Sequence, residues 1–246
     1  MFKLNVGMVL GTLLLAAPAW SSLITVNNFS FESPVLVGTD PGVTTTAGFG
    51  LTVPTIAGWT ITGTAGTYAP TTVAPTVNFY ANATGPTHVP TNGAGIVPST
   101  DGGAQVAFLK DGATIFQDLT GAPLGGSLGY SLTVDIGHRL EITSPISYSI
   151  MLETSTGTVL ATLPGTLSSI DAGYWSQRTL YFVGDDSTFV GQNLRVALSA
   201  SGGANQVNFD NVQVDSGVPE IGGSAVFWTM FGVAGFWIYR KKRLVA

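Results

Sequence analysis

Few side chains in this sequence could carry acid–base chemistry near neutral pH. The two histidines, His88 and His138, are the side chains whose ordinary pKa lies in that range. His138 directly follows an alternating strand pattern and adjoins Arg139 and Glu141, so we expect it to make a hydrogen bond at the strand end. The sequence contains no Gly-x-Ser-x-Gly turn, His-Glu-x-x-His helix or phosphate-binding glycine loop. It therefore offers no recognisable catalytic motif.

Carboxylates are the remaining candidates for catalysis. A pair of carboxylates suffices for glycoside hydrolysis, but the pairing is spatial and does not show in a sequence. Six of the acidic residues in the body of the chain are candidates: Asp101, Asp111, Asp118, Asp135, Glu141 and Glu153. Because no pattern singles out two of them, we expect a non-enzymatic protein. The alternative is a carbohydrate-active enzyme, a glycoside hydrolase or lyase.

Four ring-bearing residues could stack on a sugar. Sugar binding needs exposed aromatic faces close to hydrogen-bonding groups, and Trp59, Tyr68, Tyr80 and His88 lie in or beside residues 65–99, which are rich in Thr, Pro and Gly. We predict a long exposed loop system there and take these four residues as ligand-binding candidates. For Trp59 the alternative is burial, because GWTIT is typical of the start of a core strand.

The composition limits the fold and the partners. Only 9% of the residues are charged, whereas Gly (32) and Pro (13) are abundant, which favours strands and turns over helices. Between Leu23 and Pro219, four basic residues stand against thirteen acidic ones, a formal charge of −9. This charge would repel a phosphate backbone and argues against nucleic-acid binding. Cysteine is absent, so disulfides and thiolate metal sites are excluded.

Short alternating runs predict strands throughout residues 23–216. GYSLTVDIGH places Tyr130, Leu132, Val134 and Ile136 on one face, and PISYSIMLE and NLRVALS alternate in the same way. The further strands that we expect are Trp59–Thr62, Val77–Tyr80, Ala104–Leu109, Thr114–Leu119, Arg178–Val183 and Gln206–Val214. Eight or more strands without helices to cover a parallel sheet indicate an all-β, antiparallel β-sandwich.

The last predicted strand contains an irregularity. In QVNFDNVQV the apolar positions are Val207 and Phe209, then Val212 and Val214, so the alternation slips by one residue at Asp210-Asn211. A strand must change faces at such a point unless it bulges. We therefore expect a β-bulge or a sharp twist at this pair.

Residues 1–22 have the features of a secretory signal peptide. Lys3 supplies the positive charge, Val6–Ala17 the apolar stretch, and residues 17–19 (Ala-Pro-Ala) a small-residue cleavage site. The alternative is an uncleaved anchor helix. With the signal removed, the body of the chain would lie outside the cytoplasm.

The C-terminal segment predicts a transmembrane helix. Residues 221–239 carry no charge, and as a helix they would span roughly 28 Å, close to the thickness of a hydrocarbon core. The basic tail that follows should stay on the cytoplasmic side of the membrane. Its members are Arg240, Lys241, Lys242 and Arg243.

The order of features in residues 217–246 resembles the PEP-CTERM sorting signal of exported bacterial proteins. Val218-Pro219-Glu220 matches the short motif, and the apolar helix and the basic tail follow in the same order. The resemblance implies an exosortase-like processing enzyme as a partner and passage through the inner membrane. The usual second Pro is replaced by Ile221, so the alternative is a permanently anchored surface adhesin.

The body of the chain has a resemblance of its own. NNFSFESP, GWTIT, GGAQVAFL, GYSLTVDIGHRLE and FDNVQV follow one another as in the jelly-roll domains of many PEP-CTERM proteins and in galactose-binding-like and carbohydrate-binding sandwiches. Such modules often hold a structural calcium ion, and by position the resemblance implies Glu32 and Asp210 as its ligands. Calcium does prefer oxygen ligands of this kind. The alternative is a solvated Glu32 and a turn-capping Asp210.

Together these features predict an exported protein with one jelly-roll β-sandwich. The resemblance implies a place at the cell surface or in the extracellular matrix of a Gram-negative-type bacterium, with a structural or polysaccharide-associated role and a structural calcium ion as cofactor.

Overall fold

Antiparallel strands build almost all of the computed structural model, which describes residues 22–36, 44–46, 50–69, 105–125, 129–140, 142–203 and 205–217. Within these residues the strands are β1 (Ser22–Ile24), β2 (Thr44–Thr46), β3 (Gly50–Val53), β4 (Thr60–Thr62), β5 (Ala65–Ala69), β6 (Val106–Lys110), β7 (Thr114–Pro123), β8 (Tyr130–His138), β9 (Ser147–Thr154), β10 (Val159–Thr166), β11 (Tyr174–Phe182), β12 (Asn193–Ser201) and β13 (Gln206–Ser216). Two short 3-10 helices, η1 (Leu167–Ser169) and η2 (Ser187–Phe189), complete the described elements.

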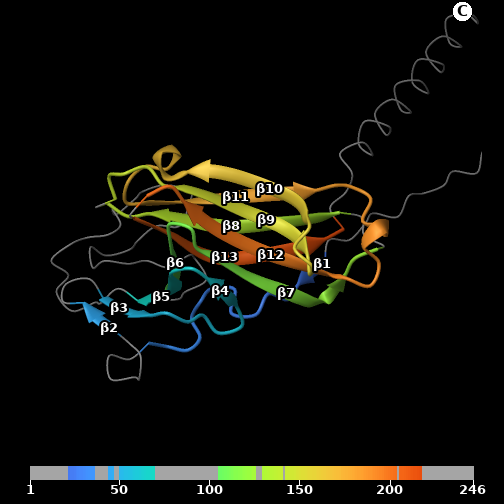
Figure 1. Cartoon of the computed structure of the whole chain (residues 1–246), viewed down its shortest axis with the longest axis horizontal. Helices are drawn as coiled ribbons and strands as arrows, with labels where there is room; N and C mark the ends of the chain where they lie inside the picture. Colours follow the sequence, from blue (N-terminus) through green and yellow to red (C-terminus); the bar gives the residue numbers. More distant parts are fainter. Residues whose placement is uncertain are drawn as a thin grey trace, which may run out of the picture.

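The strands form two sheets that pack face to face (Figure 1). The eight-stranded sheet has the order β11-β8-β13-β6-β5-β3-β2, and β1 pairs with β13 beside this path. The five-stranded sheet has the order β10-β9-β12-β7-β4. Every described strand pair is antiparallel. The predicted all-β antiparallel sandwich is therefore confirmed.

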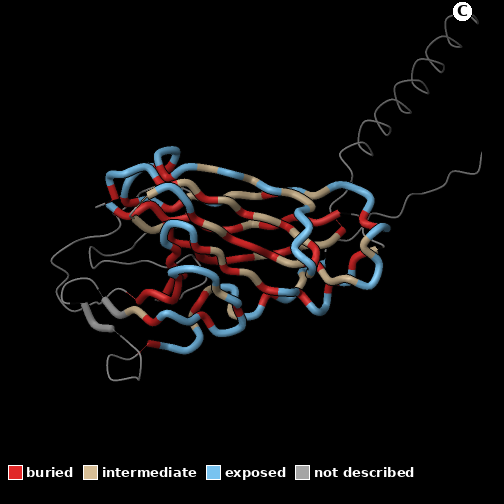
Figure 2. Tube along the Cα trace, in the orientation of Figure 1, coloured by how far each residue is buried: buried red, intermediate tan, exposed pale blue. Residues whose placement is uncertain are grey.

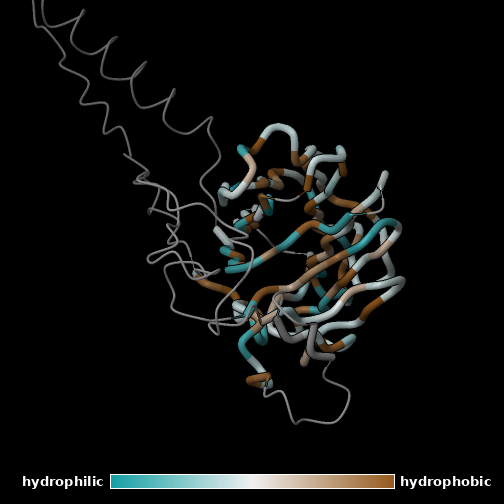
Figure 3. Tube along the Cα trace, turned by 90° about the vertical axis from the view of Figure 1, so that its left-hand side faces the viewer, coloured by the Kyte–Doolittle hydropathy of each residue, from teal (hydrophilic) through white to brown (hydrophobic). Residues whose placement is uncertain are grey.

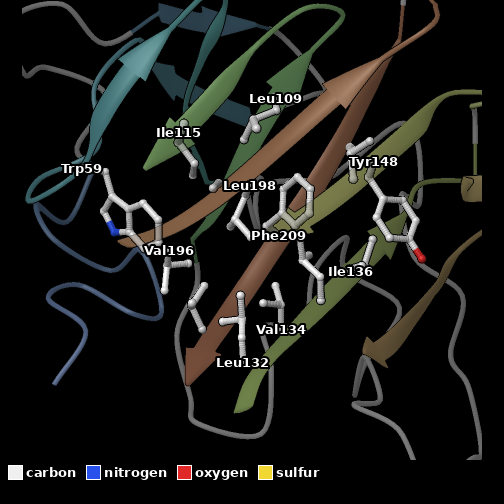
Figure 4. Packing of buried hydrophobic residues seen from close by; sticks show 14 of the residues in the cluster. Trp59, Leu109, Ile115, Leu132, Val134, Ile136, Tyr148, Val196, Leu198 and Phe209 are labelled. Carbon is white, nitrogen blue, oxygen red and sulfur yellow. The ribbon is translucent and has the colours of Figure 1, made fainter. Parts of the chain in front are cut away.

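Alternating side chains fill the space between the sheets. Strand β9 changes from intermediate to buried at every second residue, and buried and less buried positions alternate along the strands in Figure 2. Figure 3 shows hydrophobic and hydrophilic stretches interspersed along the chain. Leu132, Val134 and Ile136 of β8 enter this core opposite Val196 and Leu198 of β12 (Figure 4). Residues at the intervening positions of β8 must therefore point to the outer face of the eight-stranded sheet.

The irregular strand contains the expected bulge. The register between β13 and β8 shifts between Asp210 and Gln213, and Asn211 has a φ of 49°. This left-handed backbone conformation is one that asparagine tolerates better than most residues. The bulge returns Val212 and Val214 to the core.

The predicted loop system of residues 65–99 is wrong at its start. Ala65–Ala69 is strand β5, and all five of its residues are buried, because Ala65 packs in the core and Tyr68 packs on the opposite face. Residues 70–99 lie outside the described part of the chain, as does the strand expected at Val77–Tyr80.

Both terminal predictions also fall outside the described residues. They concern residues 1–21 of the signal peptide, the motif Val218-Pro219-Glu220, the apolar segment 221–239 and the basic tail 240–243. Among the residues that the structure describes, no helix has the length and apolar character to cross a membrane. The sorting signal and the exosortase-like partner stay predictions.

Candidate active site

Polar side chains are buried on the outer face of the eight-stranded sheet. Asp135 of β8 and Asp210 of β13 are register partners, and each has a relative exposure of 0%. Both lie at positions that alternate with core residues, so both belong to the face that points away from the five-stranded sheet. Side chains paired in this way have Cβ atoms about 4.5–5.5 Å apart. Two carboxyl groups therefore lie side by side on the outer face of this sheet, and neither is exposed to solvent.

Amide groups surround Asp135. Its Oδ1 accepts a hydrogen bond from Nε2 of Gln177 in β11, and its Oδ2 accepts one from Nδ2 of Asn211 at the bulge, each at 3.2 Å. The Oδ1 atom of Asn211 in turn accepts a hydrogen bond of 2.7 Å from Nε2 of Gln213. We call Asp135, Gln177, Asp210, Asn211 and Gln213 the polar site.

The carboxyl group of Asp210 is held by the bulge itself. The backbone N–H of Asn211 donates a hydrogen bond of 2.8 Å to Oδ1 of Asp210. The left-handed conformation of Asn211 orients this N–H group, while the Asn211 side chain is held by Asp135 and Gln213. The bulge thus joins the two carboxyl groups of the polar site into one hydrogen-bonded unit.

An aromatic cluster adjoins the polar site on the same face. It consists of Tyr68 (β5), Val106 and Phe108 (β6) and Trp175 (β11), all buried. Asn208 of β13 is the register partner of both Phe108 and Gly137, and Gly137 is also the partner of Trp175. Since Gly137 has no side chain, bare backbone separates Trp175 from Asn208.

Arg139 lies at the end of this face. Its guanidinium carbon is 5.1 Å from the centroid of the Tyr68 ring, and the residue is only 8% exposed. This distance is typical of a cation–π interaction. One end of the aromatic cluster is therefore positively charged, whereas the polar site carries carboxyl groups.

The two sugar-stacking candidates that the structure describes do not offer exposed rings. Trp59 lies between the sheets at the edge of the core, where its ring centroid is 5.5 Å from that of Phe31 and its Nε1 donates to the carbonyl of Asn27 (Figure 4). Tyr68 is 3% exposed in the aromatic cluster. Tyr80 and His88 lie outside the described residues.

His138 has a structural environment. Its Nδ1 lies 2.6 Å from the carbonyl oxygen of Ile170, and its Nε2 lies 3.0 Å from that of Ile142. Both ring nitrogens therefore face backbone oxygens of neighbouring loops. The predicted hydrogen bond at the strand end is present, and it ties two loops to β8.

The two predicted calcium ligands each contact a backbone N–H group. Oε1 of Glu32 accepts a hydrogen bond of 2.7 Å from Gln105, and Oδ1 of Asp210 accepts the one from Asn211. Calcium commonly takes six to eight oxygen ligands. Within the described ranges, no three His, Asp or Glu side chains gather as a metal site. The calcium ion stays a prediction.

Sequence reasoning identified only part of this site. The phase slip drew attention to Asp210, whereas Asp135 was one of six undistinguished carboxylates, and Phe108 and Gln177 were not considered as site residues. The available signal was the amide-rich composition of QVNFDNVQV beside an aspartate. Burial on the outer face depends on neighbouring strands and leaves no trace in the alternation of β8.

A β-sandwich with buried carboxyl groups beside aromatic rings is compatible with an enzyme, and comparison with known proteins gives the class. The family model described as HpiC1-like, HpiC1 cyclase, matches residues 22–215. The chain therefore belongs to the HpiC1-like family.

Particular solved structures share the fold. The chain is 24% identical to an apo-form cyclase from Fischerella sp., with 81% of this chain and 98% of that chain covered and a TM-score of 0.56. It is 22% identical to the Stig cyclase Fisc from Fischerella sp. TAU, solved in complex with (3Z)-3-(1-methyl-2-pyrrolidinylidene)-3H-indole, with 82% and 100% covered and a TM-score of 0.57. No curated protein matches the chain.

The family corrects the predicted function. A non-enzymatic surface or matrix protein was expected because no catalytic motif is present, but the matching family is described as a cyclase. That prediction is wrong. The absence of a motif does not exclude an enzyme, because side chains from distant strands can meet in space, as those of the polar site do from β8, β11 and β13.

Proposed function

We propose that this protein is a cyclase that closes a ring within an indole-type compound, with Asp210 as the proton donor. The observation that carries the proposal is the buried Asp135–Asp210 pair beside the aromatic cluster, in a chain of the HpiC1-like family. The indole compound bound by Fisc supports the choice of substrate class.

The pairing of the two carboxyl groups supports the acid role. Two full negative charges at neighbouring buried positions are unfavourable, so such a pair favours one shared proton. Both oxygens of Asp135 accept amide N–H groups, which stabilises its ionised form. Oδ1 of Asp210 accepts one N–H, from Asn211, so we place the shared proton on Asp210 and the negative charge on Asp135.

The proposed reaction is an isomerisation that needs no oxidant, reductant or added group. Asp210 donates its proton to an unsaturated carbon or nitrogen of the substrate, which becomes an electrophile. An internal alkene or ring carbon attacks it, and one carbon–carbon bond forms at the expense of a π bond. The resulting cation loses a proton to the Asp210 carboxylate, which restores the acid.

The aromatic cluster suits the cationic intermediate of such a reaction. Trp175, Phe108 and Tyr68 provide π systems that stabilise a delocalised cation and provide an apolar surface for a planar ring. Exclusion of water by these side chains would also keep the cation from being hydrolysed. The guanidinium of Arg139 already stacks on Tyr68, so we expect the substrate to contact Trp175 and Phe108, which are 3% and 8% exposed, once it displaces the groups that cover them.

Turnover of synthetic indoles by the full-length chain tests the proposal. A panel of indoles that carry an alkene side chain would be incubated with the protein, and liquid chromatography with mass spectrometry would detect products of unchanged mass and altered retention. We expect cyclisation, and we expect Asp210→Asn to reduce its rate by about 10²–10⁴-fold.

Asp118→Asn is the matched control, because Asp118 is a carboxylate on the outer face of the other sheet. It should cyclise the panel at the wild-type rate. Failure of the wild-type protein to convert any member of the panel would contradict the proposed activity. A full rate in Asp210→Asn would contradict the role of Asp210.

A further inference from the structure

We infer that Asp135 is a positioning residue that sets the orientation of the Asp210 carboxyl group, an inference that rests on the proposed function. Asp135 contacts the reacting group through the bulge: its Oδ2 accepts from Nδ2 of Asn211, and the backbone N–H of Asn211 donates to Oδ1 of Asp210. Two consecutive hydrogen bonds therefore connect the two carboxyl groups.

The Asn211 side chain is held on both sides, which makes this connection rigid. Its Nδ2 is 3.2 Å from Asp135, and its Oδ1 accepts a 2.7 Å hydrogen bond from Gln213. With its amide fixed at both ends, Asn211 keeps the left-handed φ of 49° that directs its N–H to Asp210. Without the Asp135 acceptor, the Asn211 side chain would keep the hydrogen bond to Gln213 and lose the one to β8.

Gln177 fixes Asp135 in turn. It lies on β11 as the register partner of Asp135, and its Nε2 donates to Oδ1 at 3.2 Å. The carboxylate thus receives one N–H from each neighbouring strand and has a defined rotation. The network runs from β11 through β8 to the bulge of β13 and ends on the proposed acid.

Stability alone does not account for an aspartate at this position. A fully buried carboxylate costs several kcal/mol of desolvation, by an order-of-magnitude estimate, and an apolar residue of similar volume often stabilises a protein more. Thr or Val would satisfy the strand equally well at this outward position of β8. A charged side chain that is buried where an apolar one would be more stable is typical of functional sites.

A charge-relocation experiment tests the inference in the full-length chain. Asp135→Asn keeps the shape of the side chain but replaces one acceptor oxygen by an N–H donor and removes the negative charge, so either Gln177 or Asn211 must turn its amide or lose its hydrogen bond. The double variant D135N/Q177E supplies a carboxylate at position 177 that accepts from the new amide, which leaves the amide oxygen for Asn211. Q177E alone and Thr133→Val, a β8 variant that removes only the hydroxyl contact with Thr179, are the controls.

We expect kcat for the converted indole to fall by about 10²-fold in Asp135→Asn, because a displacement of about 1 Å at a reacting group can cost that much. KM should stay within about twofold, and D135N/Q177E should regain most of the lost kcat. Thr133→Val should match the wild type. An unchanged kcat in Asp135→Asn overturns the inference. A variant whose kcat and melting temperature both fall while its KM rises, with no recovery in D135N/Q177E, also overturns it, because that result indicates a purely structural role.

A second readout separates this inference from the proposed function. If the wild-type protein converts no indole in the panel, the proposed cyclase activity is wrong. The positioning role of Asp135 is then tested by NMR of protein labelled with 13C at the aspartate carboxyl carbons. The Asp210 signal is identified by its loss in Asp210→Asn. A shift of this signal in Asp135→Asn that reverts in D135N/Q177E supports the role. An unmoved signal overturns it.

Discussion

At the scale of single residues, Arg195 and Asp118 form an ion pair on the five-stranded sheet that can be compared with the buried carboxyl groups of the polar site. Nε and Nη2 of Arg195 donate to the two oxygens of Asp118 at 2.7 and 3.1 Å, its Nη2 also donates to the carbonyl of Ser155, and its guanidinium carbon lies 4.1 Å from the ring centroid of Phe116. With Asp118 40% exposed, this ion pair stabilises the fold only weakly. It differs in this respect from the buried carboxyl pair of the polar site.

Glu153 lies across from Arg195 and gives a prediction for pH dependence. Partial burial raises the pKa of its carboxyl group above the ordinary 4.5; the positive charge of Arg195 opposes this rise, and the negative charge of Asp118 adds to it. A carboxyl group with a raised pKa favours the folded state while it is protonated, and this contribution is lost as the pH rises through the folded-state pKa.

We therefore expect Glu153→Gln to gain stability relative to the wild type as the pH rises from about 3 to about 7. Urea denaturation across that range measures the difference. The two proteins should converge at the acidic end. Parallel curves would show that the attraction to Arg195 cancels the effect of burial on the Glu153 pKa, and a variant that loses stability relative to the wild type as the pH rises would show that the attraction is larger.

Of the two carboxyl groups at the polar site, only one could be singled out from the sequence. Asp210 interrupts the alternation of its strand, and that interruption is a physical signal of a bulge. Asp135 occupies a regular outward position in GYSLTVDIGH, where a solvated aspartate is the ordinary expectation. Its burial results from contacts with β11 and β13, which no local pattern encodes.

At the scale of strands, the bulge in β13 is the element that shapes the site. Asn211 has a positive φ, which costs a β-branched residue about 1–3 kcal/mol and costs glycine nothing. Glycine and valine at this position both lose the hydrogen bonds to Asp135 and Gln213. The two substitutions thus differ mainly in backbone strain.

We expect Asn211→Val to be less stable than Asn211→Gly by about 1–3 kcal/mol, because only valine is strained at this φ. Thermal and urea denaturation of both variants beside the wild type give the difference. Equal stabilities would mean that the backbone relaxes out of the left-handed conformation, and the account of the bulge would need revision.

The sequence analysis did not predict five of the described strands, β1, β2, β3, β5 and β10, and for two of them the reason can be identified. The sequence of β5, AGTYA, has no alternation of apolar and polar residues, because both of its faces are buried. Strand β10 contains Pro164 and Gly165, which are typical of a turn. Pro164 is tolerated since β10 is an edge strand, and a Cβ on Gly165 would lie 2.3 Å from Cζ of Tyr148, so only glycine leaves room for that ring.

At the scale of the whole molecule, the two sheets have different outer faces. The eight-stranded sheet buries carboxyl, amide and aromatic side chains on its outer side, whereas the described outer face of the five-stranded sheet carries the exposed ion pair. Alternation and turn residues suffice to predict a sandwich of this class. They do not reveal which outer face is buried, and the absence of a motif then led to the wrong conclusion about catalysis.

In the function that we propose, the outer face of the eight-stranded sheet binds an indole ring beside Asp210. A crystal structure of the full-length protein with the indole compound that Fisc binds tests it most directly. We predict the ring system against Trp175 and Phe108, with a polar atom within about 3.2 Å of the Asp210 carboxyl group. The same compound bound in another part of the molecule, with the polar site and the aromatic cluster unoccupied, would contradict the account.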